Sequence, residues 1–426
     1  MFNQIRVPLF LCLYFFERNK IKNPVQRVKL FFLQIAPILL ITAALTAASV
    51  PWSIGFIIAI AISIWHAKIS NEPHATIMVG CSLLLVMAIL ECSLRLTQNR
   101  PTYYRPDERL AVSEHLCYKP NSTVENFKQP FGDLYGISNY TASSVIEPRT
   151  VTYRIDSLGY RNDRPFREGD LVIVGDSFIV GTGVTQEETL ANRLSKKLGR
   201  GVYSLSFPGD PPNYVSLLEQ FTEKTGSKCK AVFFFFEGND FEDESIKTPK
   251  KPFLFYDPYE FRILESYRFL FGLSRRAIHN YSSGKRQHDS VIWRLGGKDM
   301  AFYQKYISQV ESPKRGNWDN ITRAFRRIQD RVELIVFIPD KYRVYHSMIP
   351  EVAARPLPNA QLSFVCEMAA ELGNPPILDL TNPMVKASEN LLKEGRHTFW
   401  RDDTHWNGEG IAVAAQSLAE YFGTKN

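Results

Sequence analysis

Three polar side chains, one of them far from the other two in the chain, have the types needed to attack an ester. Ser177 interrupts an apolar run in "VIVGDSFIVG", and Asp402 and His405 stand three residues apart in "WRDDTHWNGEG". In a helical turn, residues three apart share one face, so the Asp402 carboxylate would orient one imidazole nitrogen while the other faces Ser177. Such a base activates a weak hydroxyl nucleophile. Asp403 is the alternative acid, although two-residue spacing in a helix points it away from His405.

Alternating apolar runs and helical patterns must position these residues. Five short, nearly continuous apolar runs predict buried parallel strands, at residues 171–175, 202–206, 231–236, 332–338 and 376–380. Helical spacing between them predicts helices at residues 186–198, 213–224, 318–330, 360–372 and 409–422, the first opening with a capping box from Thr185 to Glu188. Strand and helix alternating five times predicts a three-layer α/β/α domain.

The polar residues follow the strands directly. Ligands of such sheets bind outside the carboxyl ends of the strands. Asp176 and Ser177 come after the first strand, Gly209 after the second, and Asn239 after the third. These residues are therefore expected at one functional edge, where Asp176 ties the loop by hydrogen bonds. An isolated Asp-x-x-His is also common as a helix N-cap beside a solvated histidine, and only the combination favours catalysis.

Four motifs together resemble blocks of the SGNH (GDSL) hydrolase superfamily: "GDSF" at 175–178, the glycine of "SFPGDPP", "GND" at 238–240 and "DDTH" at 402–405. The resemblance covers residues 150 to 426 and implies a flavodoxin-like serine hydrolase fold that acts on acyl esters. A G-x-S-x-G elbow of the α/β-hydrolase type is excluded because Ile179 stands where the second glycine belongs.

The resemblance also implies a role for each matching residue. Ser177 would be the nucleophile, His405 the general base and Asp402 its orienting acid. The oxyanion would be held by the backbone N–H groups of Ser177 and Gly209 and by the side-chain amide of Asn239. Each preorganised donor of this kind contributes about 2.7–4 kcal/mol of barrier lowering. The motif set implies no cofactor and no metal.

Three further segments, "YRIDSLGYRND", "FIPDKYRVYH" at 337–346 and "DTHWNGEG", are similar to membrane-anchored bacterial SGNH proteins, including alginate O-acetyltransferase-like ones. In that group Ser177 would carry an acetyl group, and Lys341, Tyr345 or Trp406 would line the acceptor groove. The alternative is that Lys341 is solvated and Trp406 packs beneath the catalytic loop.

The function so predicted is a serine esterase that cleaves acyl esters, with O-acetyl esters the first choice. One alternative is an O-acetyltransferase that modifies an envelope or extracellular polysaccharide, supplied by a separate acyl-donor protein. Another is a non-catalytic domain that binds glycan or scaffolds an assembly. Expected substrates are acylated small molecules, lipids or glycans.

The N-terminal part predicts a membrane anchor. Residues 1–29 carry six Lys and Arg residues against one Glu, which places them on the cytoplasmic side. Three apolar stretches within residues 30–96 (30–50, 53–69 and 75–90) are close to the length that spans a bilayer. Three crossings would put the catalytic domain outside the cytoplasm, on the periplasmic side of a bacterial inner membrane. A buried helical domain is the alternative.

The rest of the chain divides by composition. Residues 97–150 predict a linker or extension with short strands, and residues 151–426 the hydrolase domain. Within it, residues 241–316 interrupt the alternation, and their aromatic part predicts either a lid or packing against core or membrane. The formal charge of +7 falls mostly in the leader, so no nucleic-acid surface is expected. The six cysteines have no metal-site spacing, and at most one disulfide is expected beyond residue 97.

Overall fold

The computed structural model describes residues 105–112, 116–134, 143–241 and 290–423. They belong to one compact unit, Tyr103–Lys250 with Ser283–Asn426. Within those residues no helix combines the length and apolar character that crossing a membrane requires. The predicted leader, the three predicted membrane spans and most of the insertion at 241–316 lie outside the described residues.

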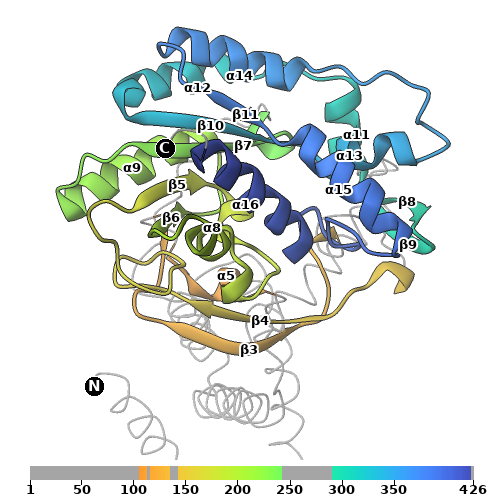
Figure 1. Cartoon of the computed structure of the whole chain (residues 1–426), viewed down its shortest axis with the longest axis horizontal. Helices are drawn as coiled ribbons and strands as arrows, with labels where there is room; N and C mark the ends of the chain where they lie inside the picture. Colours follow the sequence, from red (N-terminus) through yellow and green to blue (C-terminus); the bar gives the residue numbers. More distant parts are fainter. Residues whose placement is uncertain (1–104, 113–115, 135–142, 242–289, 424–426) are drawn as a thin grey trace, which may run out of the picture. The chain divides into compact units, whose positions relative to one another are not determined.

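The core of this unit is a five-stranded parallel sheet (Figure 1). Counted along the chain, its strands have the spatial order 2-1-3-4-5, the doubly wound order of flavodoxin-like folds. Each pairing is parallel. The strands are β5 (Leu171–Gly175), β6 (Val202–Ser206), β7 (Ala231–Phe236), β10 (Val332–Ile338) and β11 (Ile377–Asp379). All five predicted strands are confirmed, and so is the parallel α/β class.

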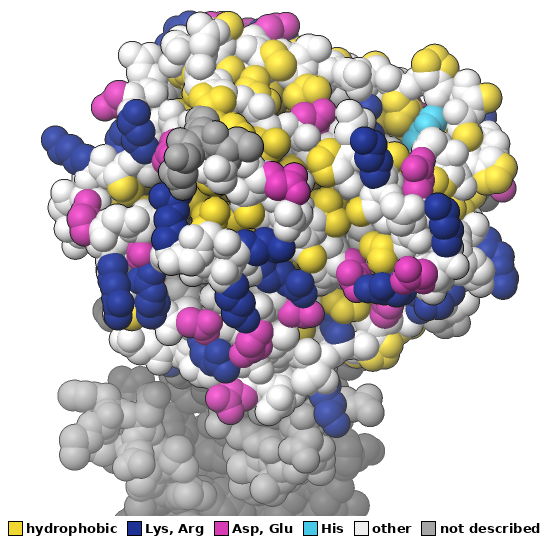
Figure 2. All heavy atoms as spheres, viewed as in Figure 1, with side chains coloured by type: hydrophobic (Ala, Val, Ile, Leu, Met, Phe, Trp, Pro, Cys, Tyr) yellow, Lys and Arg dark blue, Asp and Glu magenta, His cyan; other side chains and the backbone are white. Residues whose placement is uncertain are grey.

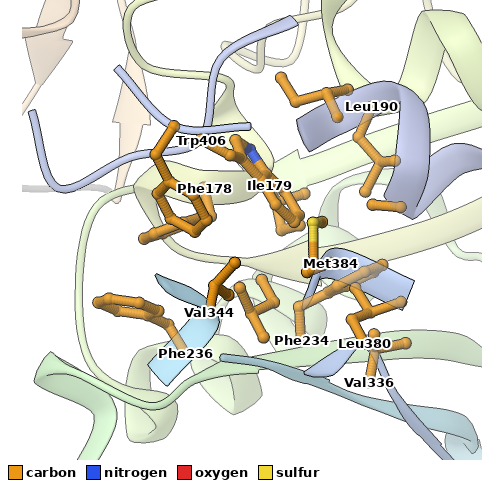
Figure 3. Packing of buried hydrophobic residues seen from close by; sticks show 14 of the residues in the cluster. Phe178, Ile179, Leu190, Phe234, Phe236, Val336, Val344, Leu380, Met384 and Trp406 are labelled. Atoms are coloured by element: carbon orange, nitrogen blue, oxygen red, sulfur yellow. The ribbon is translucent and has the colours of Figure 1, made fainter. Parts of the chain in front are cut away.

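Helices cover both faces of the sheet, which explains why every residue of β5 and β7 is buried. One face packs against α8 (Leu190–Leu198), α15 (Thr381–Lys393) and α16 (Gly408–Gly423). Figure 3 shows this core, in which Met384 of α15 lies next to Phe234 of β7, and Leu190 of α8 belongs to the same cluster. The other face packs against α9 (Pro211–Thr225), α12 (Trp318–Phe325) and α14 (Ala360–Glu371).

Two predicted helices differ in detail from the structure. The capping box is wrong, because the Thr185 hydroxyl accepts from the Thr152 N–H at 3.1 Å instead of capping a helix. A short 3₁₀ turn, η3 (Gln186–Glu188), follows, and α8 begins one turn later, where the Thr189 side chain accepts from the Asn192 N–H. The helix predicted at 318–330 ends at Phe325 and continues as the 3₁₀ turn η5 (Arg326–Arg331), since Ile328 leaves helical φ/ψ.

Two antiparallel pairs lie outside the main sheet. β3 (Thr123–Gln129) pairs with β4 (Arg149–Arg154), so the segment predicted as an extension joins the compact unit. Within the predicted insertion, β8 (Ser290–Leu295) and β9 (Lys298–Tyr303) form a hairpin closed by two glycines with positive φ, Gly296 and Gly297.

The remaining elements are short or peripheral. They are α5 (Pro106–Leu110), β1 (Ala111–Val112), β2 (Cys117–Tyr118), η2 (Ser143–Val145), α7 (Ser177–Val180), η4 (Asn239–Phe241), α11 (Gln304–Glu311), α13 (Lys341–Tyr345) and η6 (His346–Met348). The described cysteines, Cys117, Cys229 and Cys366, are free thiols. On the face that Figure 2 shows, basic and acidic side chains are interspersed.

Candidate active site

Ser177 is the first residue of α7, directly beyond the carboxyl end of β5. Asp176 caps this turn, since its Oδ1 accepts from the Phe178 N–H at 2.9 Å. The turn is tight: a Cβ at Gly175 would meet the Ile179 side chain at 2.5 Å, so glycine is required there. Burial raises the pKa of the Asp176 carboxyl. Asp176 thus has the loop-tying contact that the sequence predicted.

His405 meets Ser177 although 228 residues separate them in the chain. The imidazole Nε2 lies 2.7 Å from the Ser177 Oγ, and its Nδ1 lies 2.7 Å from the Asp403 Oδ1. The Phe178 ring packs against the imidazole, with 4.8 Å between the ring centroids. A hydroxyl, an imidazole and a carboxylate are therefore joined in one line of hydrogen bonds.

The prediction that Asp402 orients His405 is wrong. That prediction assumed a helical turn, but residues 401–405 form non-helical turns and bends, in which side chains two residues apart can meet. Asp403 takes the contact with His405. The Asp402 carboxylate instead accepts from the backbone N–H groups of Gly132 and Glu147 at 2.8 and 2.9 Å.

Arg149 joins the two acids through one guanidinium. Its Nη1 donates to the Asp402 Oδ1 at 3.1 Å, and its Nη2 donates to the Asp403 Oδ2 at 2.6 Å. All three side chains are almost completely buried, and the guanidinium lies over the Trp400 ring at 4.3 Å. A planar, always-charged fork suits this bridging position, which the compact ammonium of a lysine could not fill.

The electrostatics of the acids follow from these contacts. Burial raises the pKa of Asp402, with Arg149 opposing it. Burial also acts to raise the pKa of Asp403, but the facing His405 and Arg149 hold it well below its usual range. For His405, burial acts to lower the pKa, and the Asp403 and Asp133 carboxylates outweigh it and raise the pKa. Asp403 is therefore an ionised partner for an imidazole that binds protons strongly.

Asp133 is a third carboxylate at this loop. Its Oδ1 accepts from the Thr404 N–H at 2.8 Å, its Oδ2 accepts from the Thr404 hydroxyl, and its own N–H donates to the Asp403 Oδ2 at 3.1 Å. Asp133, Asp403 and His405 place metal-ligand atoms within 4.8 Å of one another. Protein donors already occupy these atoms, and a guanidinium lies beside them, which favours a hydrogen-bonded cluster over a metal site.

Gly209 and Asn239 lie on either side of Ser177 at the same sheet edge. They follow β6 and β7, the two neighbours of β5. Within the described residues, the Gly209 N–H donates to no protein acceptor. A Cβ at Gly209 would meet the Asn213 side-chain amide at 2.5 Å, so glycine permits this close approach. The structure thus places the predicted oxyanion residues beside the nucleophile strand.

Lys341 does not line a groove, nor is it solvated. Its Nζ donates to the carbonyl oxygens of Ala301, Trp400 and Asp403 at 2.6, 2.7 and 3.0 Å, and the side chain is buried. Burial lowers the pKa of Lys341 to about 8, against the nearby Asp402 and Asp403 carboxylates. Lys341 therefore ties β9 to the loop that carries His405. Both predictions for this residue are wrong, because backbone carbonyl oxygens replace water as the acceptors of the buried ammonium.

Tyr345 and Trp406 are also buried rather than exposed to a groove. The Tyr345 hydroxyl accepts from the Thr398 N–H at 2.8 Å. Trp406 packs edge-on against Phe178 at 5.2 Å and lies beside Phe178 and Ile179 beneath the loop (Figure 3). Their proposed substrate contacts are corrected accordingly: both residues brace the loop on which His405 lies.

Sequence reasoning missed Asp133, Arg149 and Glu237. The Glu237 carboxylate accepts from the Arg343 Nε at 2.6 Å and from the Asp340 N–H at 3.0 Å. The buried ion pair of Glu237 and Arg343 fixes the start of α13 to the end of β7. The only available signal was Glu237 itself, an acid directly after an apolar strand in "EGND".

Removing Arg149 is expected to be strongly destabilising. Arg149→Met leaves two buried carboxylates without their shared cation, and breaking a buried pair from one side costs about 3–5 kcal/mol of unfolding free energy. Urea unfolding would measure the loss. Arg154→Met, which removes an exposed pair with Asp163, is the matched control and is expected to cost less than about 1 kcal/mol. Equal losses in the two variants would contradict the bridging role.

Comparison with known families supports this picture for the C-terminal part of the chain. Residues 297–425 match the family described as "SGNH hydrolase-like domain, acetyltransferase AlgX". The match confirms the resemblance that the motifs indicated. It includes Asp403 and His405 but not Ser177, Gly209 or Asn239. Comparisons with curated proteins and with solved structures found no match.

Proposed function

We propose that the chain is a serine-dependent enzyme that cleaves or transfers the acyl group of an ester. The observation that carries the proposal is the line of hydrogen bonds from Ser177 through His405 to Asp403, with 2.7 Å at each step. An SGNH hydrolase-like domain of an acetyltransferase family supports an esterase or acyltransferase. This match makes acetyl the favoured acyl group.

The proposed reaction begins with attack of the Ser177 Oγ on the ester carbonyl carbon. The Oγ–carbon bond forms while the hydroxyl proton passes to the His405 Nε2, and Asp403 stabilises the resulting imidazolium through Nδ1. The carbonyl oxygen becomes an oxyanion, for which the N–H groups of Ser177 and Gly209 and the Asn239 amide are the proposed donors. Collapse breaks the ester bond, and the Nε2 proton leaves with the alcohol.

The acyl-serine is then resolved by a second attack. Water attacks in a hydrolase, whereas a hydroxyl of an acceptor, such as a glycan, attacks in a transferase. His405 takes the proton of the attacking group and returns it to the Ser177 Oγ, which restores the starting state. We propose acylated small molecules, lipids or glycans as donors. A separate acyl-donor protein would be the source in the transferase case.

The experiment combines turnover with covalent labelling of the purified full-length chain. We expect p-nitrophenyl acetate to be cleaved and a fluorophosphonate to label one residue, which peptide mapping identifies as Ser177. Added oligosaccharide that becomes acetylated would assign transfer, and unchanged oligosaccharide with released acetate would assign hydrolysis. Absence of both turnover and labelling would overturn the catalytic proposal and favour a binding or scaffold domain.

The proposed place of action follows from the residues before the hydrolase unit. The basic leader and the three apolar stretches between residues 30 and 96 support anchoring in a membrane, with the catalytic unit outside the cytoplasm. A reporter fused after Asn426 would then be active only on the outer side of that membrane.

A further inference from the structure

His405 faces two carboxylates on its Nδ1 side. Asp403 Oδ1 lies 2.7 Å from Nδ1, and Asp133 Oδ2 lies 3.5 Å from the same atom. The Thr404 hydroxyl lies 3.4 Å from Nδ1 and donates to the Asp133 carboxylate. A catalytic triad needs one acid, so Asp133 is an additional charge beside the base.

Asp133 reaches this position from outside the α/β sheet. The chain around it is held against the His405 loop by the Gly132 N–H on Asp402 and by its own N–H on Asp403. A Cβ at Gly132 would fall 2.2 Å from the Asp402 carbonyl oxygen, so this approach requires glycine. The carboxylate of Asp133 is therefore fixed in place by contacts on both sides.

The charges around Nδ1 balance only when His405 is protonated. Three buried carboxylates, Asp133, Asp402 and Asp403, face two cations, Arg149 and Lys341, which leaves one negative charge in excess. The imidazolium formed when His405 takes the Ser177 proton removes this excess. Because buried unbalanced charge is costly, the cluster favours that protonated state.

Other charged groups near the loop do not reverse this balance. Asp176 faces His405 from the nucleophile loop, and although burial raises the pKa of its carboxyl, any ionised fraction adds further negative charge. Glu147 and Arg401 pair with each other at the less buried rim, where the Glu147 carboxylate also accepts from the Arg401 N–H. None of these three groups therefore supplies a net positive charge that would offset the excess carboxylate.

We propose that Asp133 is a positioning residue that presents a second carboxylate to His405 and, together with Asp403, stabilises the imidazolium formed during attack by Ser177. This inference rests on the proposed function. The alternative is that Asp133 only holds Thr404 in place. The two differ in what its negative charge does to proton binding at His405.

The test compares Asp133→Asn with Thr404→Val in the purified full-length chain. Asparagine keeps the shape and removes the charge, whereas valine removes the Thr404 hydroxyl and keeps the Asp133 charge. We expect the acid limb of the kcat/KM profile for p-nitrophenyl acetate to move about one pH unit lower in Asp133→Asn, because an opposite charge within 4–6 Å shifts a pKa by about 1–3 units. In Thr404→Val the acid limb is expected to stay within about 0.3 pH unit of its wild-type position. The same result is expected for the exposed control Asp319→Asn.

A second readout does not depend on turnover. In chains carrying ¹³C-labelled histidine, the His405 resonance, assigned by its loss in His405→Gln, is expected to titrate at lower pH in Asp133→Asn. An unmoved titration, or an equal shift in Thr404→Val, would overturn the charge role. If the wild-type chain is inactive but the His405 titration still moves to lower pH in Asp133→Asn, the proposed function is overturned. The effect of the Asp133 charge on proton binding at His405 then still holds.

Discussion

Ser177→Ala is expected to lower kcat for p-nitrophenyl acetate by on the order of 10⁶-fold, which leaves only the residual rate that the oxyanion donors supply. The substitution removes the only atom that His405 Nε2 could activate at this position, the Oγ at 2.7 Å. The fold should tolerate it, because alanine keeps the backbone of α7 and its Asp176 cap. Steady-state kinetics and fluorophosphonate labelling measure the loss, and near-ultraviolet circular dichroism checks the fold.

The matched control is Ser308→Ala, an exposed serine whose hydroxyl donates to the Gln304 carbonyl within α11. It should retain full turnover and full labelling. A Ser177→Ala protein that still cleaves the ester at more than about one per cent of the wild-type rate would place the nucleophile elsewhere. Residual turnover slightly above background would be explained by the oxyanion donors, which still act without the nucleophile.

The sheet could be predicted from the sequence because its strands are buried on both faces. Short continuous apolar runs such as Ala231–Phe236 are typical of strands that helices cover on both faces, and the structure places each strand within a residue of its predicted bounds. The rule that ligands bind at the carboxyl ends of parallel strands then gave the site its location. Ser177, Gly209 and Asn239 follow strands that are adjacent in the sheet.

The orienting acid could not be predicted, because it depends on the conformation of a loop. Spacing of three favoured Asp402 only if residues 402–405 were helical, and the loop is not. What decides between the two acids is a contact with residues more than 250 positions earlier in the chain, Gly132 and Arg149. The residue types in "DDTH" carry no information about these distant partners.

Lys341 shows the same limit for burial. Lysine is almost never fully buried unless it is paired, so a solvated or substrate-facing side chain was the reasonable expectation. The structure instead supplies carbonyl oxygens from β9 and from the loop at 400–403. Such a cage forms only once the hairpin β8–β9 has packed beside α13, and the sequence of the insertion gave no sign of it.

Asp403→Asn is expected to lower kcat by about 10³–10⁴-fold, because a neutral side chain at this position neither fixes the tautomer of His405 nor stabilises its imidazolium. The sign of the pH effect follows from the contacts. The Asp403 carboxylate raises the pKa of His405, so removing its charge lets the imidazole lose its proton at lower pH. The acid limb of the kcat/KM profile should move to lower pH. The ratio of wild-type to variant kcat/KM should therefore be largest at high pH.

Asp402→Asn is the comparison that decides between the neighbouring acids. Asp402 contacts Gly132, Glu147 and Arg149 but not His405, so its neutral variant should lose stability and keep kcat within about tenfold of wild type. A larger loss of kcat in Asp402→Asn than in Asp403→Asn would contradict the non-helical loop that brings Asp403 to His405. Residual activity in Asp403→Asn that disappears in the double variant with Asp133→Asn would show that the second carboxylate substitutes in part for the first.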